Sequence, residues 1–276
     1  MTTAFVLAGG GHLGAYQVGM VRALLEHEIA PGVVVGTSVG AINGAAIAAD
    51  PSLDTAKRLE EVWLNLDSEP VFARSLFGDA ARLLKRRTHL QPSEPLRELI
   101  ERMLPARTFE ELAVRFECVA ACIERAAEHW FSSGPLIDAV MASAALPGVL
   151  PPVEIGGEHF VDGGIVNSVP IERAVQLGAT ELYVLHVGRT ERPLSAPRNL
   201  IDVVTVAFEI ARRHRFTRDL EALPDGVVAH VLPTGESDPG RFNDRSQIKF
   251  RDFSAVQRRI EGAYEATRTF LAEEGG

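Results

Sequence analysis

Cysteine is scarce in this sequence, and the two cysteines present are badly placed for a disulfide bond. Cys118 and Cys122 lie four positions apart in a predicted strand, which separates them by roughly 13 Å if the chain is extended. The Cα atoms of a disulfide lie only about half as far apart. We therefore expect two buried thiols and no disulfide.

Long apolar runs and a basic leader are also absent. No stretch approaches the ~18 uninterrupted apolar residues that a transmembrane helix needs. Met1 to Ala8 lacks the basic start and the long apolar core of a secretory signal peptide. These absences lead us to expect a cytoplasmic protein, in which thiols stay reduced.

Positive charge is in deficit. The chain has 28 lysines and arginines against 37 aspartates and glutamates, a formal net charge of -9. This balance argues against nucleic acid as the main partner, because a phosphate backbone attracts basic surfaces. Apolar residues, in contrast, make up 46% of the 276 residues. That is enough to bury a large core, and we expect residues 1–276 to form a single domain.

The beginning of the chain has the pattern of a βαβ unit. Thr3 to Ala8 is a short apolar strand without polar alternation, which is typical of a parallel strand covered on both faces. A glycine-rich loop and an amphipathic helix that closes near His27 follow, and the β-branched run Val33 to Val35 is the second strand. This alternation predicts an α/β fold with a mostly parallel central sheet.

A Gly-x-Ser-x-Gly pattern, Gly36-Thr37-Ser38-Val39-Gly40, follows the second predicted strand and opens a helix predicted to run to about Ala49. A serine at the tip of such a turn needs small residues two positions away on both sides, because the two backbones pass close together. The helix N-terminus favours the negative charge that develops in acyl transfer. We predict that Ser38 is a nucleophile supported by Gly36 and Gly40. An ordinary turn capped by Ser38 is the alternative.

Four glycines, Gly9, Gly10, Gly11 and Gly14, lie between the first predicted strand and its helix. They fit the Gly-x-Gly-x-x-Gly pattern of a dinucleotide-binding loop. Such a site also needs an acidic residue at the end of the second strand, and Ser38 follows that strand instead. We therefore interpret the four glycines as an oxyanion hole whose N–H groups lie close to Ser38. A dinucleotide site and a plain glycine turn stay open as alternatives.

Asp162 ends an apolar strand and precedes Gly163 and Gly164. The preceding residues, 153–155 and 159–161, predict a tight hairpin. A carboxylate at such a bend can project where another backbone comes close. Asp162 is therefore the second candidate catalytic residue, with the two glycines supporting its turn. By itself Asp-Gly-Gly is more typical of a turn, and the two motifs upstream favour the catalytic interpretation.

Residues 50–107 interrupt the strands with a predicted helical insertion. Asp50 and Pro51 are typical of a helix start, and another helix is predicted to begin at Ser93. Between them, Val71 to Leu90 mixes apolar with basic residues. This mixture fits a lid or a contact with anionic lipid, although a charged helix that covers the edge of the core is the favoured interpretation.

Four blocks, taken in order, resemble the motifs of patatin-like phospholipases. They are 9–14, 36–40, Ser143 to Pro147 with the later Pro151-Pro152, and 162–164, and the resemblance covers about residues 3 to 190. It implies a three-layer α/β/α fold, hydrolysis of lipid acyl esters by a Ser38–Asp162 dyad, and the N–H groups of Gly10 and Gly11 as the main oxyanion donors.

The resemblance also implies a lipid ester as partner and neither a metal nor a cofactor, and it leaves membrane-surface contact and the oligomeric state open. Many family members carry an acidic residue before the glycines and a basic residue at the position of Leu13. This chain has Ala8 and Leu13 there. The resemblance therefore leaves the head group of the substrate open.

The remaining third, residues 198–276, is predicted to complete the fold. An apolar stripe from Leu200 to Ala211 and a run of arginines to Arg218 predict a helix that ends near these cations, which its dipole favours. Val227 to Leu232 predicts a last strand, and Phe253 to Leu271 a closing helix. Residues 233–247 are rich in Gly, Pro, Asp and Ser and predict a mobile loop.

Other functions fit parts of the same pattern. A soluble carboxylesterase or thioesterase with a Ser-His-Asp triad would use a histidine downstream of its acid, which here means His186, His214 or His230. The first and third lie in predicted strands and the second in the arginine run, so each has a structural explanation. A non-hydrolytic dinucleotide-binding protein or an inactive scaffold would carry no reactive serine.

Overall fold

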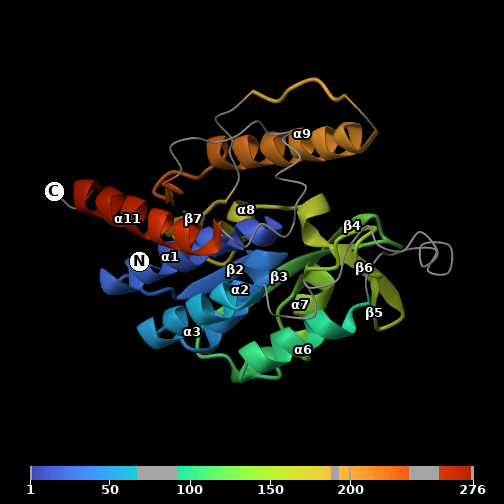
Figure 1. The fold of residues 1–276 in the computed structure, drawn as a ribbon, viewed down its shortest axis with the longest axis horizontal. Helices are drawn as coiled ribbons and strands as arrows, with labels where there is room; N and C mark the ends of the chain where they lie inside the picture. Colours follow the sequence, from blue (N-terminus) through green and yellow to red (C-terminus); the bar gives the residue numbers. More distant parts are fainter. Residues whose placement is uncertain (1, 67–91, 188–192, 199, 236–254, 275–276) are drawn as a thin grey trace.

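The computed structural model describes residues 2–66, 92–187, 193–198, 200–235 and 255–274 (Figure 1). In chain order its elements are β1 (Thr3–Leu7), α1 (Gly14–Glu26), β2 (Val33–Thr37), α2 (Val39–Ala49), α3 (Leu53–Leu64), α6 (Glu94–Met103), β3 (Arg115–Cys122), β4 (Ala127–Phe131), α7 (Leu136–Ser143), β5 (Val153–Ile155), β6 (Glu158–Asp162), α8 (Ile171–Gln176), β7 (Glu181–Leu185), α9 (Leu200–Glu221), β8 (Val228–Val231) and α11 (Val256–Glu274). The segment Val71 to Leu90 and most of residues 233–247, for which the sequence predicts a covering helix and a loop, lie outside the described residues.

The described strands form one eight-stranded sheet. Its order is β5-β6-β3-β2-β1-β7-β8, and β4 pairs with β3. The strands β3, β2, β1, β7 and β8 run parallel, whereas the hairpin β5–β6 and the strand β4 add antiparallel pairings at one end. The predicted α/β fold with a mostly parallel sheet is confirmed.

Alternate residues of β1 face two separate cores. Phe5 and Leu7 pack with residues of α1, α2, α3 and α11, whereas Ala4 and Val6 pack with residues of α8 and with Phe216 of α9. Successive side chains of a strand point to opposite faces of the sheet. Helices therefore cover both faces, as Figure 1 shows, and the three-layer arrangement is confirmed.

The strand register brings the predicted motifs to one edge of the sheet. Leu7 at the end of β1 is paired with Gly36 near the end of β2, so the glycine loop after β1 and Ser38 after β2 leave the sheet side by side. Asp162, the last residue of β6, is paired with Ala120 of β3. Loops at the carboxyl ends of parallel strands are where α/β proteins place their sites.

The helix α3 begins later than the sequence predicts. Its N-cap is Ser52, whose hydroxyl accepts the N–H of Thr55 at 3.3 Å. Asp50 instead lies in an extended conformation, and its carboxylate accepts the hydroxyls of Ser52 and Thr55 at 2.8 and 2.7 Å. The predicted helix start at Asp50 and Pro51 is therefore wrong. Asp50 binds the side chains of Ser52 and Thr55 and leaves the N-cap position to Ser52.

The helix α9 ends at Glu221, with Arg218 in its last turn. The predicted helix end near the arginines is confirmed, and His214 lies inside the helix. Phe216 of this helix is buried in the core on the side of the sheet that α8 covers. Among the helices of the described ranges, none is both long and apolar enough to cross a lipid bilayer.

The two cysteines lie in β3 as predicted. Cys118 and Cys122 are both free and buried. Burial raises the pKa of the Cys118 thiol well above its ordinary value. A buried thiol of this kind is a packing residue rather than a nucleophile.

Candidate active site

Ser38 lies at a sharp turn between β2 and α2. Its backbone has φ 56° and ψ −123°, a conformation that is disfavoured for residues with a Cβ. A Cβ on Gly36 would overlap the carbonyl oxygen of Gly40, and a Cβ on Gly40 would overlap the carbonyl oxygen of Leu7. Strand and helix thus approach so closely that neither glycine position has room for a side chain, and the turn presents the hydroxyl of Ser38.

The Ser38 hydroxyl meets Asp162, which is 124 positions away in the sequence. Ser38 Oγ donates to Asp162 Oδ2 at 2.6 Å, while the N–H of Gly164 donates to Oδ1 at 2.7 Å. The N–H of Asp162 itself donates to the carbonyl oxygen of Ala145 at 2.9 Å. A Cβ on Gly163 would overlap the carbonyl oxygen of Val119. The carboxylate therefore has one oxygen held by its own turn and the other on the serine.

Burial sets the acidity of Asp162. Its side chain is buried, and desolvation raises the pKa of the carboxyl to about 6, against the opposing effect of the bonds from Ser38 and Gly164. A carboxylate in this environment is a stronger base than one in water. At neutral pH it is ionised and able to accept the Ser38 proton.

The glycine loop lies against the serine turn. A Cβ on Gly9 would come within 3.4 Å of the Cβ of Ser38. The N–H of Gly9 donates to the carbonyl oxygen of Ser168 at 2.9 Å, and the N–H of Gly14 donates to the carbonyl oxygen of Gly11. Gly9 and Gly14 therefore shape the loop, but their N–H groups are already engaged.

Gly10 and Gly11 differ from the other two glycines. Their N–H groups have no acceptor in the described ranges. Gly11 has φ 56°, which is readily adopted only by glycine, and a Cβ on Gly10 would overlap the side chain of Val187. Among the four candidate glycines, these two, already expected as the main donors, are therefore the ones whose N–H groups have no internal acceptor in the described ranges.

This motif set identifies a family. A sequence model described as patatin-like phospholipase matches residues 5–175, which is more than half of the chain. The chain belongs to the patatin-like phospholipase family. The match decides between this family and the dinucleotide-binding fold that the glycine pattern also fits.

Individual relatives match over most of this chain but over little of their own length. Patatin-like phospholipase domain-containing protein ZK370.4 of Caenorhabditis elegans is 31% identical over 188 residues, 67% of this chain and 14% of that protein. Lysophospholipase nte1 of Aspergillus terreus is 27% identical over 196 residues, 68% of this chain and 12% of that protein. The crystal structure of VipD from Legionella pneumophila aligns with a TM-score of 0.48 at 14% identity, and covers 99% of this chain and 67% of VipD.

Ser143 is a site residue for which sequence reasoning predicted no role. Its Oγ accepts the N–H of Ser38 at 2.9 Å and donates to the carbonyl oxygen of Val119 at 2.6 Å. It thereby ties the patatin-like serine turn to β3. The sequence signal is weak, because a serine in a small, proline-rich corner has many structural uses and the partner lies 105 positions away.

The three downstream histidines lie in structural contexts. His186 directly follows β7 and stacks on Phe216 with ring centroids 4.6 Å apart. His230 lies in β8, stacks on Tyr183 at 4.9 Å and pairs with Glu274, while His214 lies within α9. Within the described ranges, the Asp162 carboxylate accepts hydrogen bonds from Ser38 and Gly164 and from no histidine.

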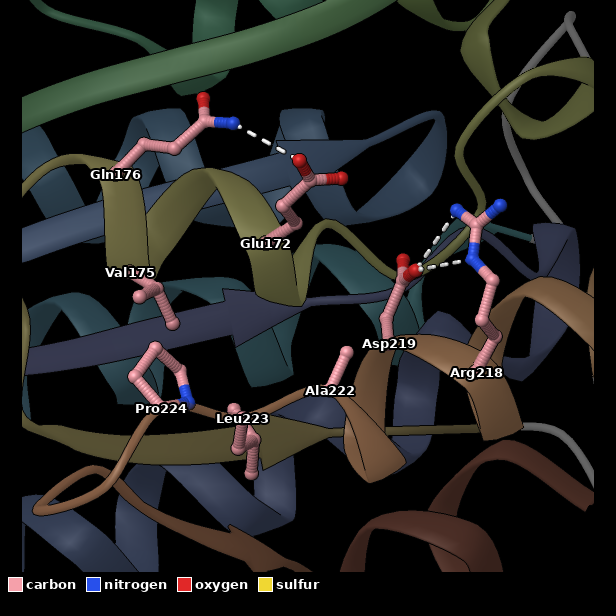
Figure 2. A pocket seen from close by; sticks show the side chains of 8 residues that line it. All are labelled: Glu172, Val175, Gln176, Arg218, Asp219, Ala222, Leu223 and Pro224. Atoms are coloured by element: carbon pink, nitrogen blue, oxygen red, sulfur yellow. Dashed lines mark hydrogen bonds and ion pairs between the residues drawn. The ribbon is translucent and has the colours of Figure 1, made fainter.

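A hollow of about 370 Å³ lies between α8 and α9 (Figure 2). Figure 2 shows that its polar side chains pair with one another: Gln176 donates to Glu172 at 3.0 Å, and Arg218 donates to Asp219 at 3.0 Å. None of the predicted site residues lines it. The candidate site is therefore the carboxyl edge of the sheet and not this hollow.

Proposed function

We propose that the protein is a serine acyl hydrolase that cleaves the carboxyl esters of lipids, with phospholipid or lysophospholipid acyl chains as substrates. The observation that carries the proposal is the 2.6 Å hydrogen bond from Ser38 Oγ to the buried carboxylate of Asp162. Family membership and a relative named lysophospholipase support a lipid ester as the substrate class.

The first half of the proposed reaction forms an acyl-enzyme. Ser38 Oγ attacks the ester carbonyl carbon while its proton passes to Asp162 Oδ2, and the carbonyl oxygen becomes an oxyanion. As this tetrahedral intermediate collapses, the ester bond breaks and Asp162 returns the proton to the leaving alcohol. The N–H of Gly164 keeps the carboxylate in place throughout.

The second half releases the fatty acid. Water attacks the acyl-enzyme, Asp162 accepts the water proton, and the proton passes to Ser38 Oγ as the acyl–oxygen bond breaks. All protons and electron pairs in these steps come from the ester, water, Ser38 and Asp162. The proposal therefore includes neither a metal nor an organic cofactor.

The oxyanion is the charge that the site must stabilise. A carboxylate is a weaker base than an imidazole, so preorganised donors carry much of the barrier reduction. The N–H groups of Gly10 and Gly11, together with the N-terminus of α2, are the proposed donors. The two glycines belong to the loop beside Ser38, and their N–H groups have no other acceptor among the described residues.

The location of the protein follows from its proposed substrate. We keep the cytoplasm, with contact to a membrane surface, as the proposed location, since the sequence carries no predicted membrane span and lipid esters lie in membranes. The acidic charge balance supports a partner other than nucleic acid.

A fluorophosphonate probe tests the proposal. Such a probe is expected to label the wild-type protein at Ser38, as located by peptide mass spectrometry, because the turn presents one hydroxyl beside a base. Ser38→Ala should lose both labelling and ester hydrolysis while unfolding at the wild-type temperature. Labelling at another serine, or an unreactive wild-type protein, would contradict the proposal. A panel of acyl esters with and without phosphate head groups then defines the substrate.

A further inference from the structure

Two buried side-chain amides lie beneath the glycine loop. The first, Gln17 of α1, is fully buried. Its Nε2 donates to the carbonyl oxygen of Ala8 at 2.8 Å and to that of Leu185 at 3.2 Å. Ala8 directly precedes the glycines, and Leu185 ends β7. Gln17 therefore holds the start of the loop against the neighbouring strand.

The second amide, Asn43 of α2, holds the other end of the loop. It is 1% exposed, and its Nδ2 donates to the carbonyl oxygen of Gly14 at 3.1 Å and to Gln17 Oε1 at 2.9 Å. One pair of amides thus contacts the carbonyl before the first glycine and the carbonyl of the last. Gly10 and Gly11 lie between these two fixed points.

Trp63 of α3 completes the network. The indole Nε1 of Trp63 donates to Asn43 Oδ1 at 3.1 Å. A Cβ on Gly14 would come within 2.8 Å of the Trp63 ring. In each of the two amide groups, both the oxygen and the nitrogen therefore have a hydrogen-bond partner. Because a buried amide left without a partner is costly, the network favours a single arrangement of both side chains.

We propose that Gln17, Asn43 and Trp63 are positioning residues that orient the oxyanion donors by holding both ends of the glycine loop. This inference rests on the proposed function, and none of the three side chains is proposed to touch the ester. Displacing the loop should weaken binding of the transition state more than binding of the substrate. The expected signature is a lower kcat with little change in KM.

Gln17→Met and Trp63→Phe test the proposal, with Trp130→Phe on β4 as the control. In Gln17→Met the new side chain has a similar length but no amide. In Trp63→Phe the indole N–H that donates to Asn43 is removed. On a soluble acyl ester, Gln17→Met should lower kcat by about tenfold to a hundredfold, since small displacements in a site have effects of this size. Trp63→Phe should lower kcat by about threefold to tenfold, and both should keep KM within about twofold.

A trifluoromethyl ketone supplies a second measurement, because its adduct with the serine carries an oxyanion. Its Ki should rise by the same factor as kcat/KM falls across the variants. Fluorophosphonate titration gives the fraction of reactive protein, so partial unfolding is corrected for. Trp130→Phe should match the wild type in all of these measurements.

The outcomes separate the two proposals. If the variants fold, titrate fully and keep kcat and ketone affinity within about twofold of Trp130→Phe, the network is only structural and the inference is wrong. If Gln17→Met does not fold, Trp63→Phe decides the matter alone. If the wild-type protein neither hydrolyses esters nor reacts with the probe, the proposed function fails and the inference fails with it.

Discussion

Asp162 shows how burial changes the acidity of one side chain. Its carboxyl has a pKa raised from an ordinary 3.8 to about 6, because burial disfavours the charged form. At a pH between these two pKa values, Asp162 is mostly protonated in the folded protein and mostly ionised in the unfolded chain. Stability from the protonated group is therefore present below about pH 4 and is lost as pH rises through 6. The same burial makes the ionised carboxylate a stronger base at neutral pH.

The pH dependence of hydrolysis should follow this group. We expect kcat/KM to fall at low pH with an apparent pKa near 6, because only the ionised carboxylate can accept the Ser38 proton. The measurement is a pH profile on a soluble ester, with substrate held far below KM. An acid limb near pH ~4, the ordinary range of an aspartate, would show that burial does not control the base.

Asp162→Asn tests the identity of the base. It should lose hydrolysis, because the amide has nearly the same shape but cannot take a proton. His186→Ala, His214→Ala and His230→Ala, where they fold, should keep most activity. The wild type loses the stability of its protonated Asp162 as pH rises from about 4 to 6, whereas Asp162→Asn has no such group to lose. The variant should therefore gain stability relative to the wild type over this range.

All four variants are compared on one ester, with urea unfolding as the control for folding. A folded histidine variant as inactive as Asp162→Asn would replace the dyad by a triad.

At the scale of an element, the glycine loop combines four glycines with two different uses. Gly9 and Gly14 donate their N–H groups within the structure, to Ser168 and Gly11. Gly10 and Gly11 keep theirs without an acceptor in the described part of the chain. The loop is therefore held by the hydrogen bonds of Gly9 and Gly14, while the N–H groups of Gly10 and Gly11 stay available as donors to an oxyanion.

Gly11→Ala is expected to lower kcat by at least about a hundredfold, which is the usual effect of losing one oxyanion donor. The reason is that alanine disfavours the φ of 56° on which the direction of the N–H depends. Gly178→Ala, in the turn before β7, is the matched control. Gly178 has φ 85°, and no atom lies within 4 Å of the position that a Cβ would take there.

Both variants strain a left-handed position, so their loss of stability in urea should be similar. Equal activity losses would mean that backbone strain alone, and not the oxyanion loop, explains the effect.

At the scale of the whole molecule, the two ends of the described chain pack together. The helix α11 lies along α1 (Figure 1), and Tyr264 donates to Glu26 at 2.6 Å. A Cβ on Gly19 of α1 would overlap the carbonyl oxygen of Ile260. The last helix therefore covers the helix that follows the glycine loop, and it does so at backbone contact distance.

Gly19→Ala should destabilise the protein by roughly 1–3 kcal/mol, the usual effect of overpacking a close contact. Gly262→Ala on α11 is the control, because the nearest atom to a Cβ there is 3.8 Å away, and alanine should stabilise that helix by up to about 1 kcal/mol. Urea unfolding of both variants measures the difference. Equal stabilities would show that α11 does not dock as described.

Local patterns in the sequence were enough to predict the fold class and the main candidates for the site. An apolar strand without alternation, as in Thr3 to Ala8, requires cover on both faces, and glycines two positions on either side of Ser38 suit a turn between packed backbones. These features depend on neighbouring residues, whose geometry is set by short-range sterics. The start of α3 was predicted less well, because the carboxylate of Asp50 accepts the hydroxyl of Thr55 instead of capping the helix.

The remaining features of the site depend on contacts between distant segments. Ser168 engages the N–H of Gly9, and Ser143 anchors the serine turn from 105 positions further along the chain. Gln17 and Asn43 look like ordinary polar residues of two helices until the parallel strands bring those helices together. Hydrogen bonds of this kind require donors and acceptors to meet within about 3 Å, and only the packed sheet and its helices bring them that close.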